Sequence, residues 1–307
     1  SNLLTKYQLL RLDKNFAPFH ITKGCLSEKN IDKLIDLLLK KNNTVKSLNL
    51  SNCKLTSEVF EKLKLFKNLK SLNLHHTLDY REIITGCRNF SKLYKLINKY
   101  ENEWMSEIFN LNLKLLDISN NAFVNKESFK LLERMDSLEI LSMEDLYFSN
   151  NFKNLDFITI MYSKLSNLRE LDISSNLVTM EEIKEISKLK KLELLYCNRI
   201  TILDWDENDV SFNIMFEDTI NYIIKIKTLK YLDISNFEGM WYKYNPTEEE
   251  LIDDDSMVDF NFVLDKINLL TSELNKLKKL KCVISRKPDP RTREITINGV
   301  KVILNDI

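Results

Sequence analysis

One short phrase recurs along the chain and constrains its fold more than any other feature. Its best-preserved copy is LRELDISSN at residues 168–176, and further copies are VKSLNLSNC at 45–53, LKLLDISNN at 113–121 and LKYLDISNF at 229–237. With small departures, all follow L-x-x-L-x-L-x-x-N/C. In a strand, residues two apart face the same side, so Leu171 and Ile173 enter a core together. One copy cannot bury its own apolar face, whereas stacked copies can.

Because of this phrase, the chain resembles a leucine-rich-repeat protein of the intracellular, long-repeat style. The resemblance implies an α/β solenoid: a leucine-rich-repeat horseshoe with a parallel concave sheet and convex helices. The second leucines of the copies predict the strands, at Leu48, Leu72, Leu116, Leu141, Leu171, Leu195 and Leu232. Apolar spacing between them predicts convex helices after residue 27, at 56–66, 126–135, 154–165 and 180–189, and around 212–223.

A second resemblance concerns the words Leu-Asp-Ile-Ser, which occur at residues 116–119, 171–174 and 232–235. They are similar to the repeat region of Zyg-eleven-type substrate receptors of cullin ubiquitin ligases. This resemblance covers the repeats only and implies, as an alternative function, a substrate-recognition subunit. The family's armadillo-type region is absent from the chain, and the first 40 residues show no elongin-binding box, so no site residues are carried over.

The repeats divide the chain into four segments. Residues 1–42 are expected to form an N-terminal cap and a degenerate first repeat, 43–237 the repeats, 238–259 an acidic loop, and 260–307 a last repeat with a C-terminal β-hairpin cap. Within the repeats, the length and helical apolar spacing of residues 78–112 favour a helical insertion over a very irregular repeat. Asn298-Gly299 between two alternating strands predicts a type I′ hairpin that covers the last open sheet edge.

The loop at 238–259 carries eight acidic residues and one Lys. Such a segment either recruits a basic ligand or folds back on the basic residues between Lys276 and Arg293, and we favour the second interpretation. In the chain as a whole, Lys+Arg and Asp+Glu balance at 45 each, which gives no reason to expect nucleic-acid or membrane binding.

Nothing in the chain has the pattern of a membrane span or a signal peptide, although the sequence does not begin with Met. The five cysteines are widely spaced and form no C-x-x-C pair. They are expected to be reduced packing residues of an intracellular, cytoplasmic protein, because disulfides persist in oxidising compartments.

No catalytic or cofactor motif stands out. Asp204–Asp209 begins like a calcium loop but lacks its glycine and its final glutamate. His75 and His76 are adjacent, so on a strand they would face opposite ways and could not chelate one ion. We therefore expect no metal, no cofactor and no enzyme. An enzyme would need a cleft formed by residues 78–112 or 238–259 against the concave face.

The residues between the repeat leucines are the candidate binding surface. They mix apolar and acidic side chains, which is what a protein-binding surface for a segment carrying Lys or Arg needs. The alternative is that the Asp residues only satisfy neighbouring backbone or Ser groups. We expect a monomeric, non-enzymatic protein–protein interaction module, and a pathogen effector or a cytoskeletal adaptor fits equally well. The candidate residues are Leu115, Asp117, Ile140, Glu144, Glu170, Asp172, Leu194, Tyr196, Tyr231 and Asp233.

Overall fold

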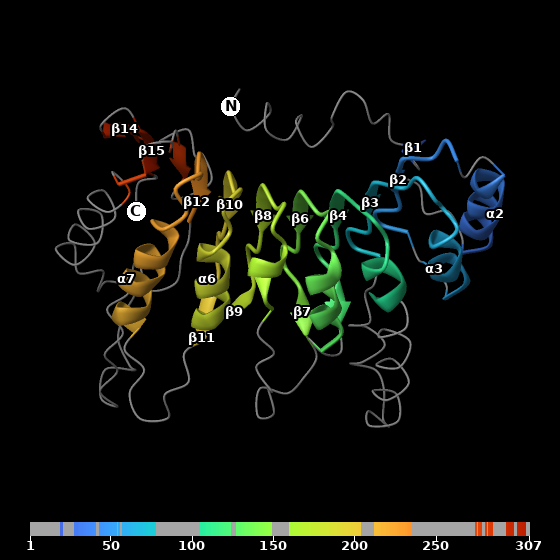
Figure 1. Cartoon of the computed structure of the whole chain (residues 1–307), viewed down its shortest axis with the longest axis horizontal. Coiled ribbons are helices and arrows are strands. Elements are labelled where there is room, and N and C mark those ends of the chain that lie inside the picture. The colour runs from blue at the N-terminus through green and yellow to red at the C-terminus, as the bar shows by residue number, and fades with distance from the viewer. Residues whose placement is uncertain are drawn as a thin grey trace, which may run out of the picture. The chain divides into compact units, whose positions relative to one another are not determined.

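The computed structural model divides into two compact units, residues 1–168 and 169–307, each described here by itself. It describes residues 19–20, 28–40, 43–53, 55, 57–77, 105–123, 127–148, 160–203, 212–234, 274, 276–277, 280, 282–284, 293–297 and 300–304. The elements are drawn in Figure 1. Most of the N-terminal cap, most of the 78–112 segment, the calcium-like sequence at 204–209 and the acidic loop at 238–259 lie outside these residues.

Unit 1 is a parallel sheet with helices following its strands. The strands pair in the order β1 (Phe19–His20), β2 (Ser47–Asn49), β3 (Ser71–Asn73), β4 (Leu115–Asp117) and β6 (Ile140–Ser142). Its helices are α2 (Glu28–Leu39), α3 (Ser57–Leu63), and the 3-10 helices η1 (Glu127–Arg134) and η3 (Tyr162–Lys164). A second parallel pair is formed by β5 (Ala122–Phe123) and β7 (Tyr147–Phe148).

Unit 2 repeats this plan. Its parallel strands are β8 (Glu170–Asp172), β10 (Leu194–Tyr196), β12 (Tyr231–Asp233), β13 (Cys282–Ile284) and β15 (Val300–Leu304). Helices α6 (Met180–Ser187) and α7 (Phe212–Ile223) follow β8 and β10, and β9 (Leu177–Thr179) pairs with β11 (Thr201–Leu203). The predicted hairpin is confirmed, because β14 (Arg293–Ile297) pairs antiparallel with β15. Its role as a cap stays a prediction.

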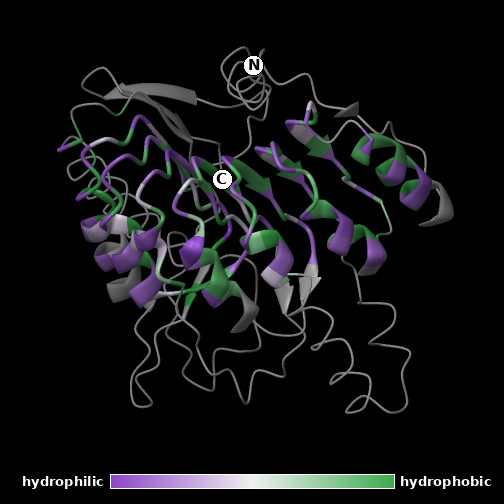
Figure 2. Cartoon of the chain, turned by 45° about the vertical axis from the view of Figure 1, so that its right-hand side comes forward, coloured by the Kyte–Doolittle hydropathy of each residue, from purple (hydrophilic) through white to green (hydrophobic). Residues whose placement is uncertain are grey.

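Seven strands, β2, β3, β4, β6, β8, β10 and β12, each hold one repeat leucine at the centre, and within each unit they pair in register. Leu171, Leu195 and Leu232 stand side by side on β8, β10 and β12, and each is at most 2% exposed. Leu48, Leu72, Leu116 and Leu141 form the equivalent buried row in unit 1. The sheet therefore has one face in the core, and Figure 2 shows hydrophobic and hydrophilic residues alternating within the helices that cover it.

A turn of fixed geometry follows the strands. Its second residue has a positive φ of 52–59° in six repeats although none of the six is glycine: Asn52, His76, Asn120, Asp145, Ser175 and Arg199. The asparagines at the end of the phrase fasten this turn. Asn121 Nδ2 donates to the carbonyls of Leu74 and Ile118, and Asn176 Nδ2 donates to that of Ile173. The turn residues are thus held by hydrogen bonds that the phrase itself supplies.

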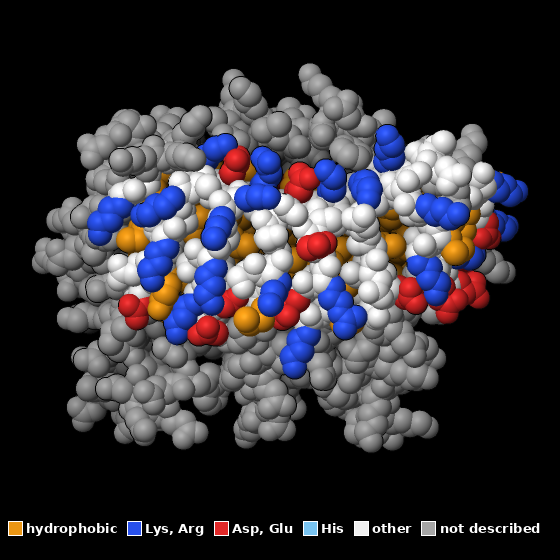
Figure 3. All heavy atoms as spheres, in the orientation of Figure 1, with side chains coloured by type: hydrophobic (Ala, Val, Ile, Leu, Met, Phe, Trp, Pro, Cys, Tyr) orange, Lys and Arg blue, Asp and Glu red, His pale blue; other side chains and the backbone are white. Residues whose placement is uncertain are grey.

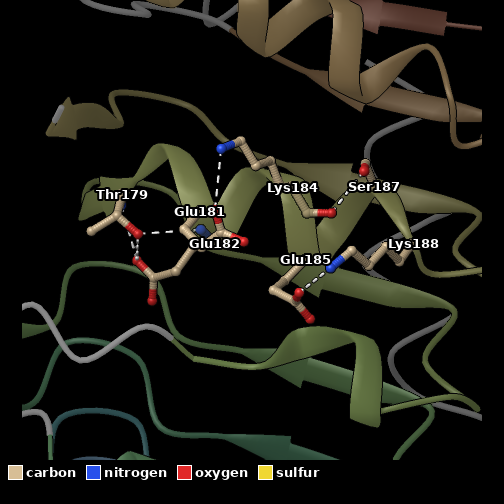
Figure 4. A network of polar contacts seen from close by, with 7 residues as sticks. All are labelled: Thr179, Glu181, Glu182, Lys184, Glu185, Ser187 and Lys188. Atoms are coloured by element: carbon tan, nitrogen blue, oxygen red, sulfur yellow. Dashed lines mark hydrogen bonds and ion pairs between the residues drawn. The ribbon is translucent and has the colours of Figure 1, made fainter.

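Helix α6 shows why the helices begin where they do (Figure 4). Thr179 and Glu182 form a capping box: Glu182 N–H donates to Thr179 Oγ1 at 3.2 Å, and Thr179 N–H donates to Glu182 Oε2 at 3.0 Å. Two orphan backbone donors are satisfied reciprocally. At the other end, Ser187 Oγ donates to the carbonyl of Lys184, and Lys188 pairs with the buried Glu185, a hydrogen bond that raises the pKa of Lys188.

Two predicted helices differ from expectation. The segment predicted at 126–135 is the 3-10 helix η1, and its buried residues Phe129 and Leu132 are three apart, which suits three residues per turn. The helix predicted over 154–165 is wrong for residues 160, 161 and 165, since only Tyr162–Lys164 are helical. Residues 154–159 lie outside the described part. No helix of the described residues is both long and apolar enough to cross a membrane.

Candidate functional site on the outer face of the sheet

The candidate residues lie where the register predicts. We call the outer face the side of each sheet formed by the first and third residues of its strands. In unit 1 it carries Leu115 opposite Ile140 and Asp117 opposite Ser142, while Glu144 follows in the turn. In unit 2 it carries two rows of strand neighbours, Glu170–Leu194–Tyr231 and Asp172–Tyr196–Asp233.

Exposure divides these residues into two groups. In unit 2, Glu170, Asp172 and Tyr231 are buried, whereas Leu194, Tyr196 and Asp233 are half-buried. In unit 1, Leu115, Asp117 and Ile140 are half-buried and Glu144 is exposed. Only the half-buried and exposed members are therefore open to contact from solvent.

Tyr196 is the centre of the unit 2 rows. It stands in register between Asp172 on β8 and Asp233 on β12. Neighbouring strands are about 4.8 Å apart, so both carboxyl-bearing residues flank the tyrosine. The Tyr196 ring also packs against that of Tyr231, with centroids 5.1 Å apart and planes tilted by 45°. We call Tyr196, Tyr231, Asp172 and Asp233 the tyrosine–aspartate site.

The carboxylates of the aspartates at the strand ends also accept hydrogen bonds from the backbone of the following turn. Asp172 Oδ1 accepts the N–H of Ser174 at 3.0 Å, and Asp117 Oδ1 accepts that of Ser119 at 3.0 Å. Asn49 and Asn73 make the same bond to the residue two positions on, at 2.9 and 2.8 Å. This Asx turn supports, for Asp117 and Asp172, the interpretation that the acid satisfies neighbouring backbone. Asp117 Oδ2 in addition accepts from Asn73 Nδ2 at 3.2 Å.

In two repeats that lack Asp or Asn at the third strand position, the turn N–H donates to a serine hydroxyl of the preceding repeat. Ser142 and Tyr196 occupy the third strand position of β6 and β10 and cannot make an Asx turn. There, Glu144 N–H donates to Ser119 Oγ at 3.1 Å and Asn198 N–H donates to Ser174 Oγ at 3.2 Å. The structure thus frees the third position of β10 for a tyrosine, at no loss of a backbone hydrogen bond.

Cys197 lies beside the tyrosine–aspartate site but on the core side. It is 1% exposed, and its Sγ donates to the carbonyl of Asp233 at 3.2 Å. Burial, and then the nearby Asp233 and Asp172, raise the pKa of this thiol well above its usual value. A thiol held neutral is a poor nucleophile and a poor metal ligand, so Cys197 serves packing, as expected. Cys53 is a buried free thiol too.

The two histidines lie in a turn, which corrects the expectation that they occupy a strand. Strand β3 ends at Asn73, and His76 has a φ of 52° in the turn that follows. The ring centroids of His75 and His76 are 6.5 Å apart, and His76 Nδ1 lies 3.3 Å from the carbonyl oxygen of Asn120. Among the described residues, no group of three His, Cys, Asp or Glu side chains is placed to hold a metal ion.

Sequence reasoning missed a row of charged residues immediately before the strands. Five of its backbone carbonyls, those of Lys46, Lys70, Lys114, Arg169 and Glu193, each accept two N–H groups from the next repeat, as Glu193 O does from Lys230 and Tyr231. Its side chains pair across repeats: Lys114 with Glu139 at 2.7 Å, Lys230 with Glu193 at 2.6 Å and Arg169 with Glu193 at 3.8 Å. The signal was the charge that precedes x-L-x in each copy: Lys46, Lys70, Lys114, Glu139, Arg169, Glu193 and Lys230.

Comparison with known proteins gives one family match. The model of the Leucine Rich Repeat family matches residues 44–65. No curated protein matches the sequence.

Solved structures with a similar course include internalin C2 of Listeria monocytogenes (17% identity, TM-score 0.39, covering 64% of this chain and 65% of that one). A second is another internalin of Listeria monocytogenes (16% identity, TM-score 0.43, covering 86% of this chain and 62% of that one). A third is the TLR13–ssRNA13 complex (18% identity, TM-score 0.38, covering 79% of this chain and 32% of that one). The chain spans less than two thirds of the length of each, and such loose likenesses transfer no function.

The family match falls on one repeat, and the structure shows the same unit in the others. Each has a three-residue strand with a buried central leucine, six have a following residue of positive φ, and all pair in parallel register with their neighbours within a unit. The phrase at residues 44–65 is therefore the local form of a pattern that runs through both units. This chain therefore contains leucine-rich repeats, of which the copy at residues 44–65 matches the family model.

Proposed function

We propose that this protein is a non-enzymatic protein–protein interaction module, and that it binds a partner segment carrying Lys or Arg at the tyrosine–aspartate site of unit 2. The observation that carries the proposal is the register of β8, β10 and β12, which sets the half-buried Tyr196 between Asp172 and Asp233. A cation above a tyrosine ring gains from the ring's quadrupole, and neighbouring carboxylates add to that attraction.

Rigidity supports the proposal. Tyr196 packs on the buried ring of Tyr231, and its own backbone belongs to a strand paired on both sides. Asp172 is fixed by its bond from Ser174 N–H. Little side-chain freedom is therefore lost on binding, and an aromatic anchor held in place is typical of an interface hot spot.

Leu194 and the unit 1 residues extend the proposal. Leu194 is half-buried next to Tyr231 and offers an apolar contact for the stem of a Lys or Arg side chain. Leu115 and Ile140 form a similar apolar pair in unit 1, with Asp117 and Glu144 close in sequence. We propose these four as a separate contact area of unit 1.

The test is a selection of peptides displayed on phage against the full chain. Enriched peptides should carry Lys or Arg, and they should lose affinity for the Leu194→Ala/Tyr196→Ala variant while the Leu115→Ala/Ile140→Ala variant identifies any share of unit 1. Enrichment of acidic or uncharged peptides, or equal binding to a folded Leu194→Ala/Tyr196→Ala variant, would contradict the proposal.

The ligase alternative depends on the first 40 residues, most of which lie outside the described part. Its test remains the capture of an elongin–cullin complex by the full chain. The enzyme alternative needs a buried acid–base pair in a cleft, whereas the buried Asp172 carboxylate of the tyrosine–aspartate site accepts a backbone N–H.

A further inference from the structure

A second charged surface lies in unit 2, on the turns that immediately precede the strands of the sheet. We call it the basic strip. Its residues precede strands β8, β10, β12 and β13 in the chain: Arg169, Lys188, Lys190, Lys191, Lys225, Lys227, Lys230 and Lys276. Figure 3 shows Lys and Arg side chains spread over the face seen in Figure 1, with Asp and Glu side chains among them.

The strip is strongly unbalanced in charge. Among its described turn residues Glu193 is the acidic one, and it lies between Arg169 and Lys230, at 3.8 and 2.6 Å. Lys188 pairs with the buried Glu185 at the end of α6. The turns of unit 1 also carry lysines, two of which are paired: Lys64 with Glu107 at 3.1 Å and Lys114 with Glu139 at 2.7 Å.

The strip is held in line by the fold. Parallel pairing of β10, β12 and β13 makes the turns before these strands, which carry the lysines, follow one another along the sheet. The apolar residues between the lysines point into the core: Leu189, Leu192, Ile226 and Leu229 are at most 3% exposed. What reaches solvent is therefore a row of ammonium groups on a rigid base.

The chemistry of the strip favours one class of partner. Buried leucines leave no apolar anchor for insertion into a bilayer. The ring of Tyr222, which adjoins the strip, carries the ammonium of Lys225 3.9 Å from its centroid, and base stacking would have to displace that contact. Seven of the eight charges are lysines, which act as point charges rather than as planar forks for phosphate. Carboxylates along an extended protein segment fit such a row.

We propose that the basic strip binds a protein segment rich in Asp and Glu, as a second interaction surface distinct from the tyrosine–aspartate site. The protein then carries two surfaces of opposite preference on the same unit, one for basic and one for acidic segments. The proposal does not depend on the proposed function of the outer face, because no residue is shared between the two surfaces.

The experiment titrates the full chain into a fluorescein-labelled peptide of alternating Glu and Asp and follows anisotropy. Binding should weaken about tenfold or more in Lys190→Glu/Lys227→Glu, since two reversals turn attraction into repulsion at the centre of the strip. Neither lysine forms an ion pair with another described residue, although Lys227 Nζ donates to the carbonyl of Ile224. The neutral Lys190→Gln/Lys227→Gln variant covers the case in which the reversal disturbs α7, and it should weaken binding in the same direction.

The matched control is Lys33→Glu/Lys130→Glu, two exposed lysines of unit 1 with the same change in net charge. It should bind the acidic peptide as the wild type does, and all complexes should dissociate at roughly 1 M salt, where the Debye length is about 3 Å. Equal weakening in the control would overturn the proposal in favour of an effect of net charge alone. Tighter binding of single-stranded RNA or of phosphatidylserine vesicles, lost in Lys190→Gln/Lys227→Gln, would overturn it in favour of another class of partner.

Discussion

The backbone N–H of Asn198 donates to the hydroxyl oxygen of Ser174 in the preceding repeat, at 3.2 Å. The N–H of Ser174 itself is taken by Asp172 Oδ1 at 3.0 Å. These two bonds stabilise the turns after β8 and β10. Because Ser174 accepts the turn N–H after β10, the third position of that strand can be a tyrosine, where other repeats have an Asp or Asn that accepts this N–H. The display of Tyr196 on the outer face thus depends on a serine one repeat earlier.

This relation predicts different costs for two small changes. Ser174→Ala leaves the Asn198 N–H without its acceptor and should lower the free energy of unfolding by about 1–3 kcal/mol. Asp172→Asn keeps the oxygen that accepts from Ser174 and should cost much less. Chemical denaturation measures both, and amide exchange at Asn198 reports the lost bond. An unchanged Ser174→Ala variant would contradict the relation.

The buried rows predict which apolar residues cannot become charged. Leu116→Asp and Ile173→Asp each bury an unpaired carboxylate at a site at most 1% exposed, and either should cost more than about 4 kcal/mol or prevent folding. Leu177 is the matched control, because its side chain is 41% exposed, and Leu177→Asp should change stability by roughly 0.5 kcal/mol or less. A thermal melt of Leu116→Asp equal to wild type would refute the repeat register.

The capping box of α6 predicts a local effect. Thr179→Ala removes the acceptor of Glu182 N–H while the bond from Thr179 N–H to the Glu182 carboxylate is kept, so unfolding should become easier by about 1 kcal/mol. Lys184→Ala breaks the exposed pair with Glu181 and removes an ammonium that lies 6.0 Å from the centroid of the Tyr222 ring, and it should cost about 0.5 kcal/mol or less. Equal effects in urea titrations of the two variants would argue against a capping role for Thr179.

The buried thiol of Cys197 predicts a pH dependence. Its pKa is raised in the folded protein, so its contribution to stability is fully present below the unfolded pKa of about 8.5 and is lost as the pH rises above that value. Iodoacetamide at pH 9 should modify Cys197 much more slowly than it modifies a cysteine in the unfolded chain, as mass spectrometry can follow. The Cys197→Ala variant should show a flatter decline of stability above pH 8.5. Labelling at the rate of a free thiol would show that Cys197 is accessible.

The strands could be predicted from the sequence because one buried leucine every repeat leaves little choice of register. All seven second leucines lie at the centres of strands, and the C-terminal hairpin forms around Asn298-Gly299 as predicted. The helices were harder to predict. Apolar residues three apart, such as Phe129 and Leu132, fit an α-helix in a sequence and a 3-10 helix in the structure.

The candidate site was predictable only in part. The pattern places Tyr196 between two aspartates, since strand register follows from the leucines. It does not predict that Glu170 and Tyr231 are buried, because that depends on contacts between segments distant in sequence. The exchange of an Asx bond for a serine of the previous repeat was likewise hidden, since Ser174 and Asn198 are 24 residues apart.

The most direct test of the account is the affinity of a Lys- or Arg-bearing peptide, obtained from the selection on the full chain, for four versions of the protein. Isothermal titration would compare wild type, Tyr196→Ala, Asp233→Asn and, as a charge-matched control, Asp218→Asn on the exposed face of α7. The account predicts weakened binding by Tyr196→Ala and Asp233→Asn, with thermal melts near that of the wild type, and unchanged binding by Asp218→Asn. Equal affinity for all four versions would contradict binding at the tyrosine–aspartate site.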